Sequence, residues 1–190
     1  GYVLIADKIK QDSPKTIREL KAMNIKETVM LTGDKKEVGE YVAKKLNMDK
    51  VYTELLPDGK VEKVEELLKQ KSEKGKLVFV GDGINDAPVL TISDIGVAMG
   101  GLGSDAAIEA ADIVIMTDET SKISKAINLS KKTMRIVHEN IIFAIFVKIA
   151  VLVLTAFGAS TMWEAVFADV GVSVIAIINA LRMLNIKKFE

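Results

Sequence analysis

GDGINDAP, residues Gly81 to Pro88, is the stretch that decides the fold. A short apolar run from Leu77 to Val80 precedes it, and Asn85 to Leu90 can begin a helix. The motif is therefore expected between a strand and a helix, at the carboxyl end of the strand. Open α/β sheets place their binding sites at this edge.

The polar residues of this turn suit a magnesium ion. Its two glycines are expected to let the chain turn sharply, which presents Asp82 and Asp86 with Asn85 between them. Mg²⁺ prefers a few carboxylate oxygens and keeps its other positions for water or phosphate oxygens, so the turn offers half of a phosphoryl-transfer site. A polar surface turn or a calcium loop is the alternative, although the spacing lacks the distal Glu of an EF-hand.

Composition divides the chain into two parts. It has 190 residues, 26 basic and 26 acidic side chains, 49% hydrophobic residues and no cysteine. Balanced charge argues against nucleic acid as the main partner, and a sequence without cysteine holds no disulfide or thiolate metal site. Most Lys and Glu lie before Asn140, and the apolar excess lies after it. No signal peptide is visible, and Gly1 opens directly into a strand-like segment, so we expect a chain cut from something longer.

Residues 1–130 predict alternating strands and helices. Repeated βα units of this kind indicate an α/β fold, with a parallel sheet and helices on its faces. Ser13 is expected to cap a helix that has proline in its first turn, and residues 57–59 (Pro-Asp-Gly) are expected to form a turn. The expected strands are 2–6, 27–31, 50–54, 77–80, 95–99 and 113–116, and the expected helices are 13–24, 35–47, 60–71 and a short one after Ser104. Helical spacing predicts two apolar faces, one with Val38, Tyr41, Val42 and Leu46, the other with Val61, Val64, Leu67 and Leu68.

Residues 131–190 predict a membrane-spanning helical hairpin. Two apolar runs, 141–157 and 162–184, are separated by a short turn at 158–160. At about 1.5 Å per residue, each run can cross a hydrocarbon core of roughly 30 Å. The alternative is a hydrophobic helical pair buried in a soluble domain. Basic residues flank both outer ends and none lies in the turn, so both ends are expected to be cytoplasmic and Trp163 to lie at the far interface. These basic residues are Lys131, Lys132, Arg135, Lys187 and Lys188.

Lys148 and Asp169 are the residues of the hairpin that indicate a function. Lys148 lies about eleven residues before the turn and Asp169 about nine after it, so the two are expected at similar depth and can pair. Ionisable groups in a spanning helix are costly and mark transport paths. A carboxylate favours a divalent cation, and the nearby ammonium could help to expel the ion. A purely structural ion pair is the alternative.

Other residues that could bind a phosphate or a nucleotide follow the predicted strands. The Thr32-Gly33-Asp34 turn could cradle a phosphate, or serve only as a turn. Lys60 could offset the repulsion between a phosphate and the carboxylates, or be an ordinary solvated lysine. Asp7 could contact a nucleotide ribose, or cap a turn. His138, the only histidine, is expected to have no catalytic role.

Together these motifs resemble the P-type ATPases, in their haloacid-dehalogenase-like, Rossmann-like phosphorylation domain. TGD at 32–34, LLPDGK at 55–60 and GDGINDAP match motifs of that family in order and spacing, over roughly the first two-thirds of the chain. Lys148 and the segment WEAVFADVGVSVIAIINALRML at 163–184 resemble the branch that exports zinc, cadmium and lead. The copper branch would show Tyr-Asn and Met-Ser pairs in these helices, and neither is present.

The resemblance implies an ATP-driven, multi-pass heavy-metal exporter of the cell membrane that uses Mg²⁺ and ATP. Asp169 would hold the transported ion with Lys148 as counter-ion, and Asp7 would lie near the nucleotide, although Lys10 stands where the family often has Arg. The implied phosphate-site residues are Thr32, Gly33, Asp34, Lys60, Asp82 (a Mg²⁺ ligand), Asn85 and Asp86 (a further Mg²⁺ ligand).

One part of the family pattern is missing from this sequence. The family's phosphorylated aspartate lies in an Asp-Lys-Thr-Gly-Thr segment, which this chain lacks. The resemblance therefore implies a C-terminal portion that works with a missing N-terminal portion of the same pump. A membrane-tethered phosphatase of the same superfamily and a non-catalytic assembly subunit are the alternative functions.

Overall fold

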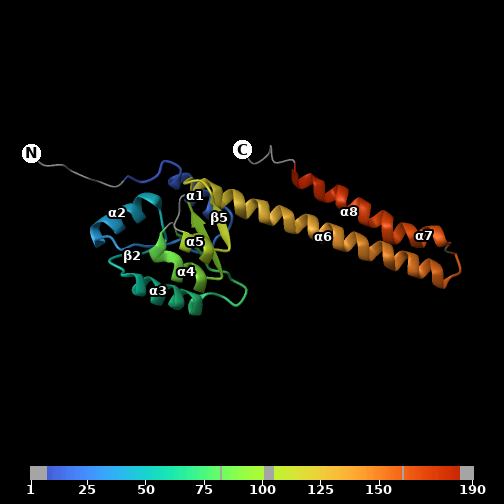
Figure 1. Cartoon of the computed structure of the whole chain (residues 1–190), viewed down its shortest axis with the longest axis horizontal. Helices are drawn as coiled ribbons and strands as arrows, with labels where there is room; N and C mark the ends of the chain where they lie inside the picture. Colours follow the sequence, from blue (N-terminus) through green and yellow to red (C-terminus); the bar gives the residue numbers. More distant parts are fainter. Residues whose placement is uncertain (1–7, 82, 101–104, 160, 185–190) are drawn as a thin grey trace, which may run out of the picture. The chain divides into compact units, whose positions relative to one another are not determined.

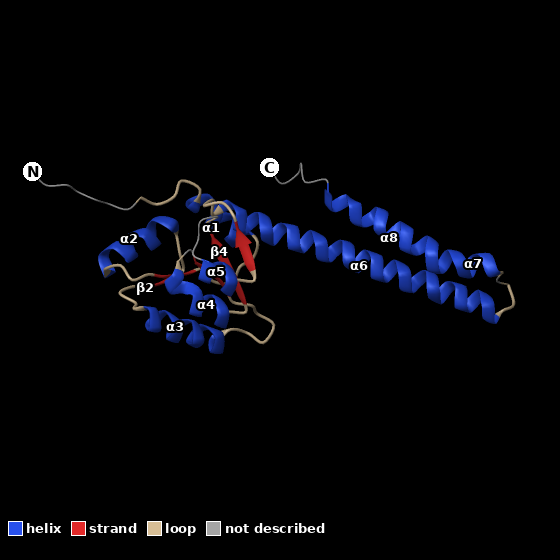
Figure 2. Cartoon of the chain, viewed as in Figure 1, coloured by secondary structure: helices blue, strands red, loops and turns tan. Residues whose placement is uncertain are grey.

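The structure, a computed structural model, describes residues 8–81, 83–100, 105–159 and 161–184. The chain divides into two compact units, Gly1–Ser124 and Lys125–Glu190. Figure 2 shows strands and helices in the first unit and helices alone in the second. The expected domain boundary between residues 130 and 131 stays a prediction.

The strand pairs that the structure describes in the first unit are all parallel, which confirms the expected α/β class. Strand β1 (Val29–Leu31) pairs with β2 (Lys50–Tyr52) in one sheet. A second sheet has the order β3 (Val78–Gly81), β4 (Ile95–Met99) and β5 (Ile113–Ile115). The strand expected over residues 2–6 lies outside the described residues, as do Ser104 and Asp7.

Helices follow the strands, as Figure 1 shows for α2 to α5. They are α1 (Ser13–Ala22), α2 (Lys36–Leu46), α3 (Pro57–Gln70), the 3₁₀ turn η1 (Ile84–Asp86), α4 (Ala87–Ile92) and α5 (Asp105–Ala110). The predicted buried stripe of α3 is confirmed, because Val64 is fully buried and its three apolar neighbours on that stripe are half-buried.

The core is built around β4, which is apolar on both faces. On one face Ala98 packs with Leu90 of α4 and Ala107 of α5. On the other, Val97 and Met99 pack with Ile115. Parallel strands covered on both sides read as continuous apolar runs, which is why Ile95–Met99 was recognisable as a strand.

Three sequence expectations about helix ends and faces were wrong. Residues 57–59 form the first turn of α3 and not a separate turn, because Leu56 is extended and proline fits the start of a helix. Ser13 lies inside α1; the N-cap is Asp12, whose carboxylate accepts the backbone N–H of Ser121 at 2.9 Å. The apolar face expected for α2 is wrong in part, because Val38 and Tyr41 are exposed whereas Val42 and Leu46 are half-buried.

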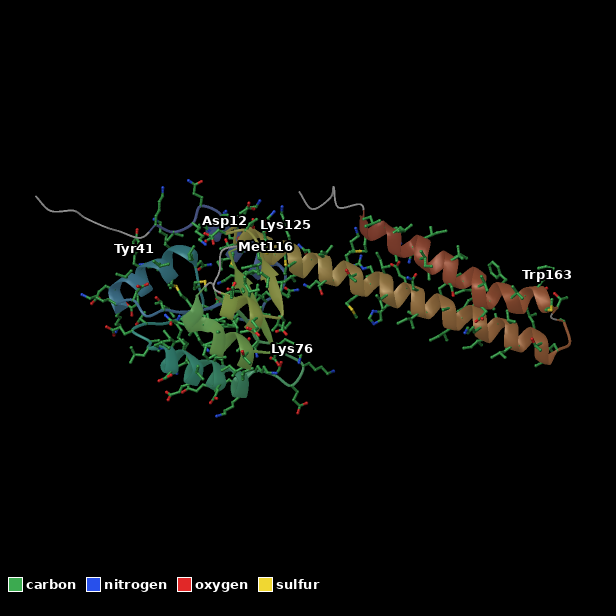
Figure 3. The ribbon with its side chains drawn as sticks, viewed as in Figure 1. Asp12, Tyr41, Lys76, Met116, Lys125 and Trp163 are labelled. Carbon is green, nitrogen blue, oxygen red and sulfur yellow. The ribbon has the colours of Figure 1, made fainter. Side chains whose placement is uncertain are left out.

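Helix α2 packs through small residues. Gly39 and Ala43 are buried, whereas Val38 and Tyr41 are 49% and 62% exposed; Tyr41 extends away from the helix in Figure 3. A Cβ at Gly39 would lie 2.4 Å from Thr53 Cγ2. Close approach of the helix to the end of β2 therefore decides its buried face, and larger apolar side chains cannot replace Gly39 there.

Asp49 fastens α1 to the start of the β1–β2 sheet. Its carboxylate accepts hydrogen bonds from the Lys21 ammonium at 2.6 Å, and from the Thr28 hydroxyl and amide at 2.6 and 2.7 Å. The Lys21 hydrogen bond, followed by those from Thr28, lowers the pKa of Asp49 from 3.8 to about 2. These bonds hold β1 in place, and Thr32 follows at its carboxyl end.

The second unit is a helical hairpin. Its elements are α6 (Ser121–Ala156), which begins in the first unit, α7 (Met162–Val166), the π-helical turn η2 (Phe167–Gly171), α8 (Val172–Ala180) and the 3₁₀ turn η3 (Leu181–Leu184). Within the described residues, Ser121–Ala156 and Met162–Leu184 are each long and apolar enough to cross a membrane. Only 6% and 12% of their most apolar stretches are buried, which argues against the buried helical pair of a soluble domain.

The hairpin turn is closed by specific caps. Gly158 has φ +70°, and the N–H groups of Gly158 and Ala159 bond to the carbonyls of Thr155 and Leu154, the pattern of a Schellman motif. At the start of α7 the Glu164 carboxylate accepts the Thr161 N–H at 2.8 Å, beside the exposed Trp163 (Figure 3). Glu164 thus caps the start of a helix in a mostly apolar run.

Candidate functional site

Lys60 and Asp86 form an ion pair at the carboxyl end of β3. Because α3 begins at Pro57, Lys60 lies in its first turn, and its Nζ is 2.8 Å from Asp86 Oδ1. The two side chains are only 19% and 12% exposed, so solvent screens the pair weakly. The sequence alternative of an ordinary solvated lysine is therefore wrong, and Lys60 orients a carboxylate of the GDGINDAP motif.

Gly81 makes room for that carboxylate. A Cβ at this position would lie 2.8 Å from both Cβ and Oδ2 of Asp86 and 3.0 Å from Cε1 of Phe79. The sharp turn expected from the two glycines passes through Asp82, which lies outside the described residues, so that expectation stays a prediction. Gly81 is required by close packing, while a Cβ at Gly83 would meet only the Asn85 N, at 3.9 Å.

Thr32, Gly33 and Asp34 form a hydrogen-bonded turn after β1. The Thr32 hydroxyl donates to Asp34 Oδ2 at 2.7 Å and accepts the Asp34 N–H at 3.1 Å. The Thr32 carbonyl accepts the Leu55 N–H at 3.1 Å, and a Cβ at Gly33 would lie 3.2 Å from the Leu55 carbonyl. This turn is thus tied to the segment that leads directly into α3 and Lys60.

The structure brings some of the expected site residues together and leaves others apart. Lys60 contacts Asp86, and Thr32 contacts Asp34, whereas Asn85 is exposed. Asp82 lies outside the described residues. Within the part of the chain that the structure describes, no three His, Cys, Asp or Glu side chains gather into a metal-binding group. The carboxylate and amide oxygens of this turn are nevertheless the donors that Mg²⁺ accepts, so the residues present fit that ion by their chemistry.

Lys148 and Asp169 pair across the hairpin, as their spacing predicted. Lys148 Nζ lies 3.6 Å from Asp169 Oδ1, and both residues line an open groove of about 510 Å³ between α6 and the segment Met162–Gly171. The side chains are 61% and 79% exposed. Asp169 lies in the π-helical turn η2, a local widening that occurs often at functional sites.

Comparison with known proteins agrees with this geometry. The sequence pattern of the haloacid dehalogenase-like hydrolases matches residues 1–91. The chain is 57% identical over 187 residues to the cadmium, zinc and cobalt-transporting ATPase of Bacillus subtilis (strain 168), an alignment that covers 98% of this chain and 27% of that protein. A crystal structure of a zinc-transporting PIB-type ATPase in the E2.Pi state has a TM-score of 0.84 and 36% identity, covering 94% of this chain and 28% of that one.

This chain belongs to the PIB-type ATPases.

A second relative agrees with the assignment to the PIB-type ATPases. The zinc-transporting ATPase of Synechocystis sp. is 54% identical over 183 residues, covering 96% of this chain and 25% of that protein. The chain thus spans about a quarter of the length of the curated relatives it matches. Membership of the PIB-type ATPases confirms the P-type resemblance and the haloacid-dehalogenase-like fold, and with the two apolar helices it identifies a membrane protein.

Four polar residues that tie the two long helices together were missed in the sequence. Glu139, Asn140, Asn179 and Arg182 form a connected set of hydrogen bonds between α6 and α8–η3. In the sequence, Asn179 and Arg182 are merely interruptions of an apolar run. The one signal that could have indicated their pairing is that each of the two apolar runs has an asparagine near the open end of the hairpin.

Proposed function

We propose that this chain is the C-terminal portion of an ATP-driven exporter of divalent heavy-metal ions. The ion pair of Lys148 and Asp169, within helices apolar enough to span a bilayer, is the observation that carries the proposal. The names of the relatives describe cadmium, zinc and cobalt transport, which supports a divalent cargo. Because the exposed ion pair would be costly in contact with lipid, further helices of the pump, or water, are needed to cover it.

The cytoplasmic unit would carry half of the phosphoryl-transfer site. ATP would phosphorylate an aspartate outside this chain, with Asp7 near the nucleotide. Lys60 and the Thr32 turn, with Gly33 and Asp34, would hold the phosphoryl group. Asp82 and Asp86, with Asn85, would hold Mg²⁺, which when bound neutralises charge on the transferred group. The Lys60–Asp86 ion pair supports this assignment, because it fixes one carboxylate at the edge of the sheet.

The hairpin would lie in the cell membrane with both ends on the cytoplasmic side. Basic residues precede the first apolar run, at Lys131, Lys132 and Arg135, and the turn at 158–160 has none. Helix α6 is continuous from Ser121 to Ala156 and carries Lys148. The N-terminal portion of the same pump would be its main protein partner.

A membrane-tethered phosphatase is the weaker reading. It would use the hairpin only as an anchor, and so gives no reason for an ion pair at matching depth in two apolar helices. The names of the relatives also describe ion transport.

The proposal is tested by phosphoenzyme formation in the full-length protein. We expect Zn²⁺ to stimulate formation of an acid-stable phosphoenzyme from ATP. Asp82→Asn should abolish phosphate capture, and Asp169→Ala should remove the dependence on Zn²⁺. Unchanged Zn²⁺ dependence in Asp169→Ala would exclude this carboxylate from the transport site, and phosphate release without any phosphoenzyme would favour the phosphatase.

A further inference from the structure

A polar ladder crosses the hairpin near its open end. Asn179 Nδ2 donates to Asn140 Oδ1 at 2.8 Å, and Asn140 Nδ2 donates to the Ala176 carbonyl at 3.2 Å. Arg182 Nη1 donates to Asn179 Oδ1 at 2.7 Å and to Glu139 Oε2 at 3.2 Å. We call Glu139, Asn140, Asn179 and Arg182 the polar ladder. It joins α6 to α8 and η3, which Figure 1 draws side by side.

The bonds of the polar ladder point in one direction. Arg182 donates to Asn179, Asn179 donates to Asn140, and Asn140 donates to a backbone carbonyl of α8. Chains of hydrogen bonds with a common direction strengthen one another, and a guanidinium at the start makes the first bond charge-assisted. Both asparagines are half-buried. Removing one amide therefore leaves its neighbour with an unsatisfied polar group where water is scarce.

The local helix geometry favours this arrangement. Asn179 lies in the last turn of α8, and Arg182 lies in the 3₁₀ turn that follows it. Side chains three positions apart lie on the same face of a helix, so the Arg182 guanidinium can reach the Asn179 amide. The other end of Arg182 reaches Glu139, on the preceding helix, next to Asn140.

The polar ladder and the Lys148–Asp169 pair fix the same two helices at two levels. Lys148 lies eight residues after Asn140, about 12 Å along α6, and Asp169 lies ten residues before Asn179, about 15 Å along its helix. A π-helical turn holds one residue more than an α-helical turn, so η2 accounts for part of the difference between these two lengths. A slip by one residue at the polar ladder would move Asp169 by about 1.5 Å and rotate it by about 100°.

We propose that the polar ladder is a positioning clamp, which sets the register of the hairpin and thereby holds Asp169 opposite Lys148 for ion binding. The inference rests on the proposed function, in which Asp169 binds the transported ion. Asn140 and Asn179 act through the helix register and do not contact the ion. Their loss weakens Zn²⁺ binding while the cytoplasmic chemistry keeps its maximal rate.

Zn²⁺-stimulated ATP hydrolysis by the full-length pump in detergent tests the clamp. In Asn140→Leu and Asn179→Leu we expect the Zn²⁺ concentration for half-maximal activity to rise about five- to tenfold, with the maximal rate within about twofold of wild type. The double variant should shift no further than the larger single shift, because both residues belong to one chain of bonds. His138→Leu is the matched control: this polar side chain is exposed on the same helix and bonds to the Met134 carbonyl one turn earlier, and we expect no change.

Two further variants distinguish a failure of the clamp from a failure of the proposed function. Arg182→Gln, at the exposed end of the polar ladder, is milder and should give a shift of about two- to threefold, even if the leucine variants fail to fold by size-exclusion chromatography. Asp169→Ala is measured in parallel. If Asp169→Ala loses Zn²⁺ stimulation while the polar ladder variants keep wild-type Zn²⁺ dependence, the clamp is refuted alone. A fall in maximal rate with unchanged half-maximal Zn²⁺ also refutes it. If Asp169→Ala behaves as wild type, the proposed function itself fails.

Discussion

Gly81 should tolerate alanine far less than Gly83, two residues later in the same motif. An added Cβ at Gly81 would lie 2.8 Å from two atoms of Asp86, a distance that forces a shift. Asp86 cannot move away cheaply, because it is 8% exposed and paired with Lys60 at 2.8 Å. Overpacking of this kind costs about 1–3 kcal/mol. At Gly83 the nearest atom would be 3.9 Å from the new Cβ, an ordinary contact.

Amide hydrogen exchange of the full-length protein in detergent measures this difference locally. Where exchange reports the opening equilibrium, 1–3 kcal/mol corresponds to about 5- to 150-fold faster exchange in peptides that cover β3 and α4. We expect this acceleration in Gly81→Ala and less than about threefold in Gly83→Ala. Equal exchange in the two variants would refute the close approach of Asp86 to the end of β3.

Three further outcomes follow from the same contacts. Lys60→Met should destabilise the first unit by about 2–4 kcal/mol, since it leaves the Asp86 carboxylate buried without a cation, and adding Asp86→Leu should recover most of the loss in a thermal unfolding scan. The pKa of Asp49 is about 2, below its ordinary 3.8, so its stabilisation is complete above about pH 4 and is lost as pH falls towards 2. Asp49→Asn should therefore lower the free energy of unfolding by about 1 kcal/mol at pH 7, after allowance for solvent screening, and should reduce the loss of stability as the pH falls from about 4 towards 2. An unchanged loss of stability in that pH range would contradict the hydrogen bonds to Asp49. Tyr41→Ser should change the unfolding midpoint by less than about 1 °C, whereas Gly39→Val should lower it by several degrees. The reverse order would mean that α2 packs through the apolar face predicted from the sequence.

The sequence predicted the strands of the described residues well because their signals are local. Ile95–Met99 is a continuous apolar run between turn signals, and the structure has a strand with those limits. Lys148 and Asp169 could be paired from the sequence because a short turn starts both helices at about the same level, so that counting residues from the turn gives their approximate depth.

The errors arose where tertiary contacts decide the outcome. Pro57 is compatible with both a turn and a first helical turn, so local chemistry could not choose between them. In α2, hydrophobicity favoured Val38 and Tyr41, but the close approach permitted by Gly39 determined the buried face. The polar ladder joins Asn140 to a residue 39 positions later, and no local pattern encodes such a pair.

Asp169 is proposed to bind the ion whose transport ATP hydrolysis drives. ATP-dependent uptake of Zn²⁺ into proteoliposomes, with the full-length pump oriented with its nucleotide side outward, tests it most directly. We expect accumulation by wild type and none by Asp169→Ala, with the control His138→Leu indistinguishable from wild type. Accumulation by Asp169→Ala at the wild-type rate would contradict it.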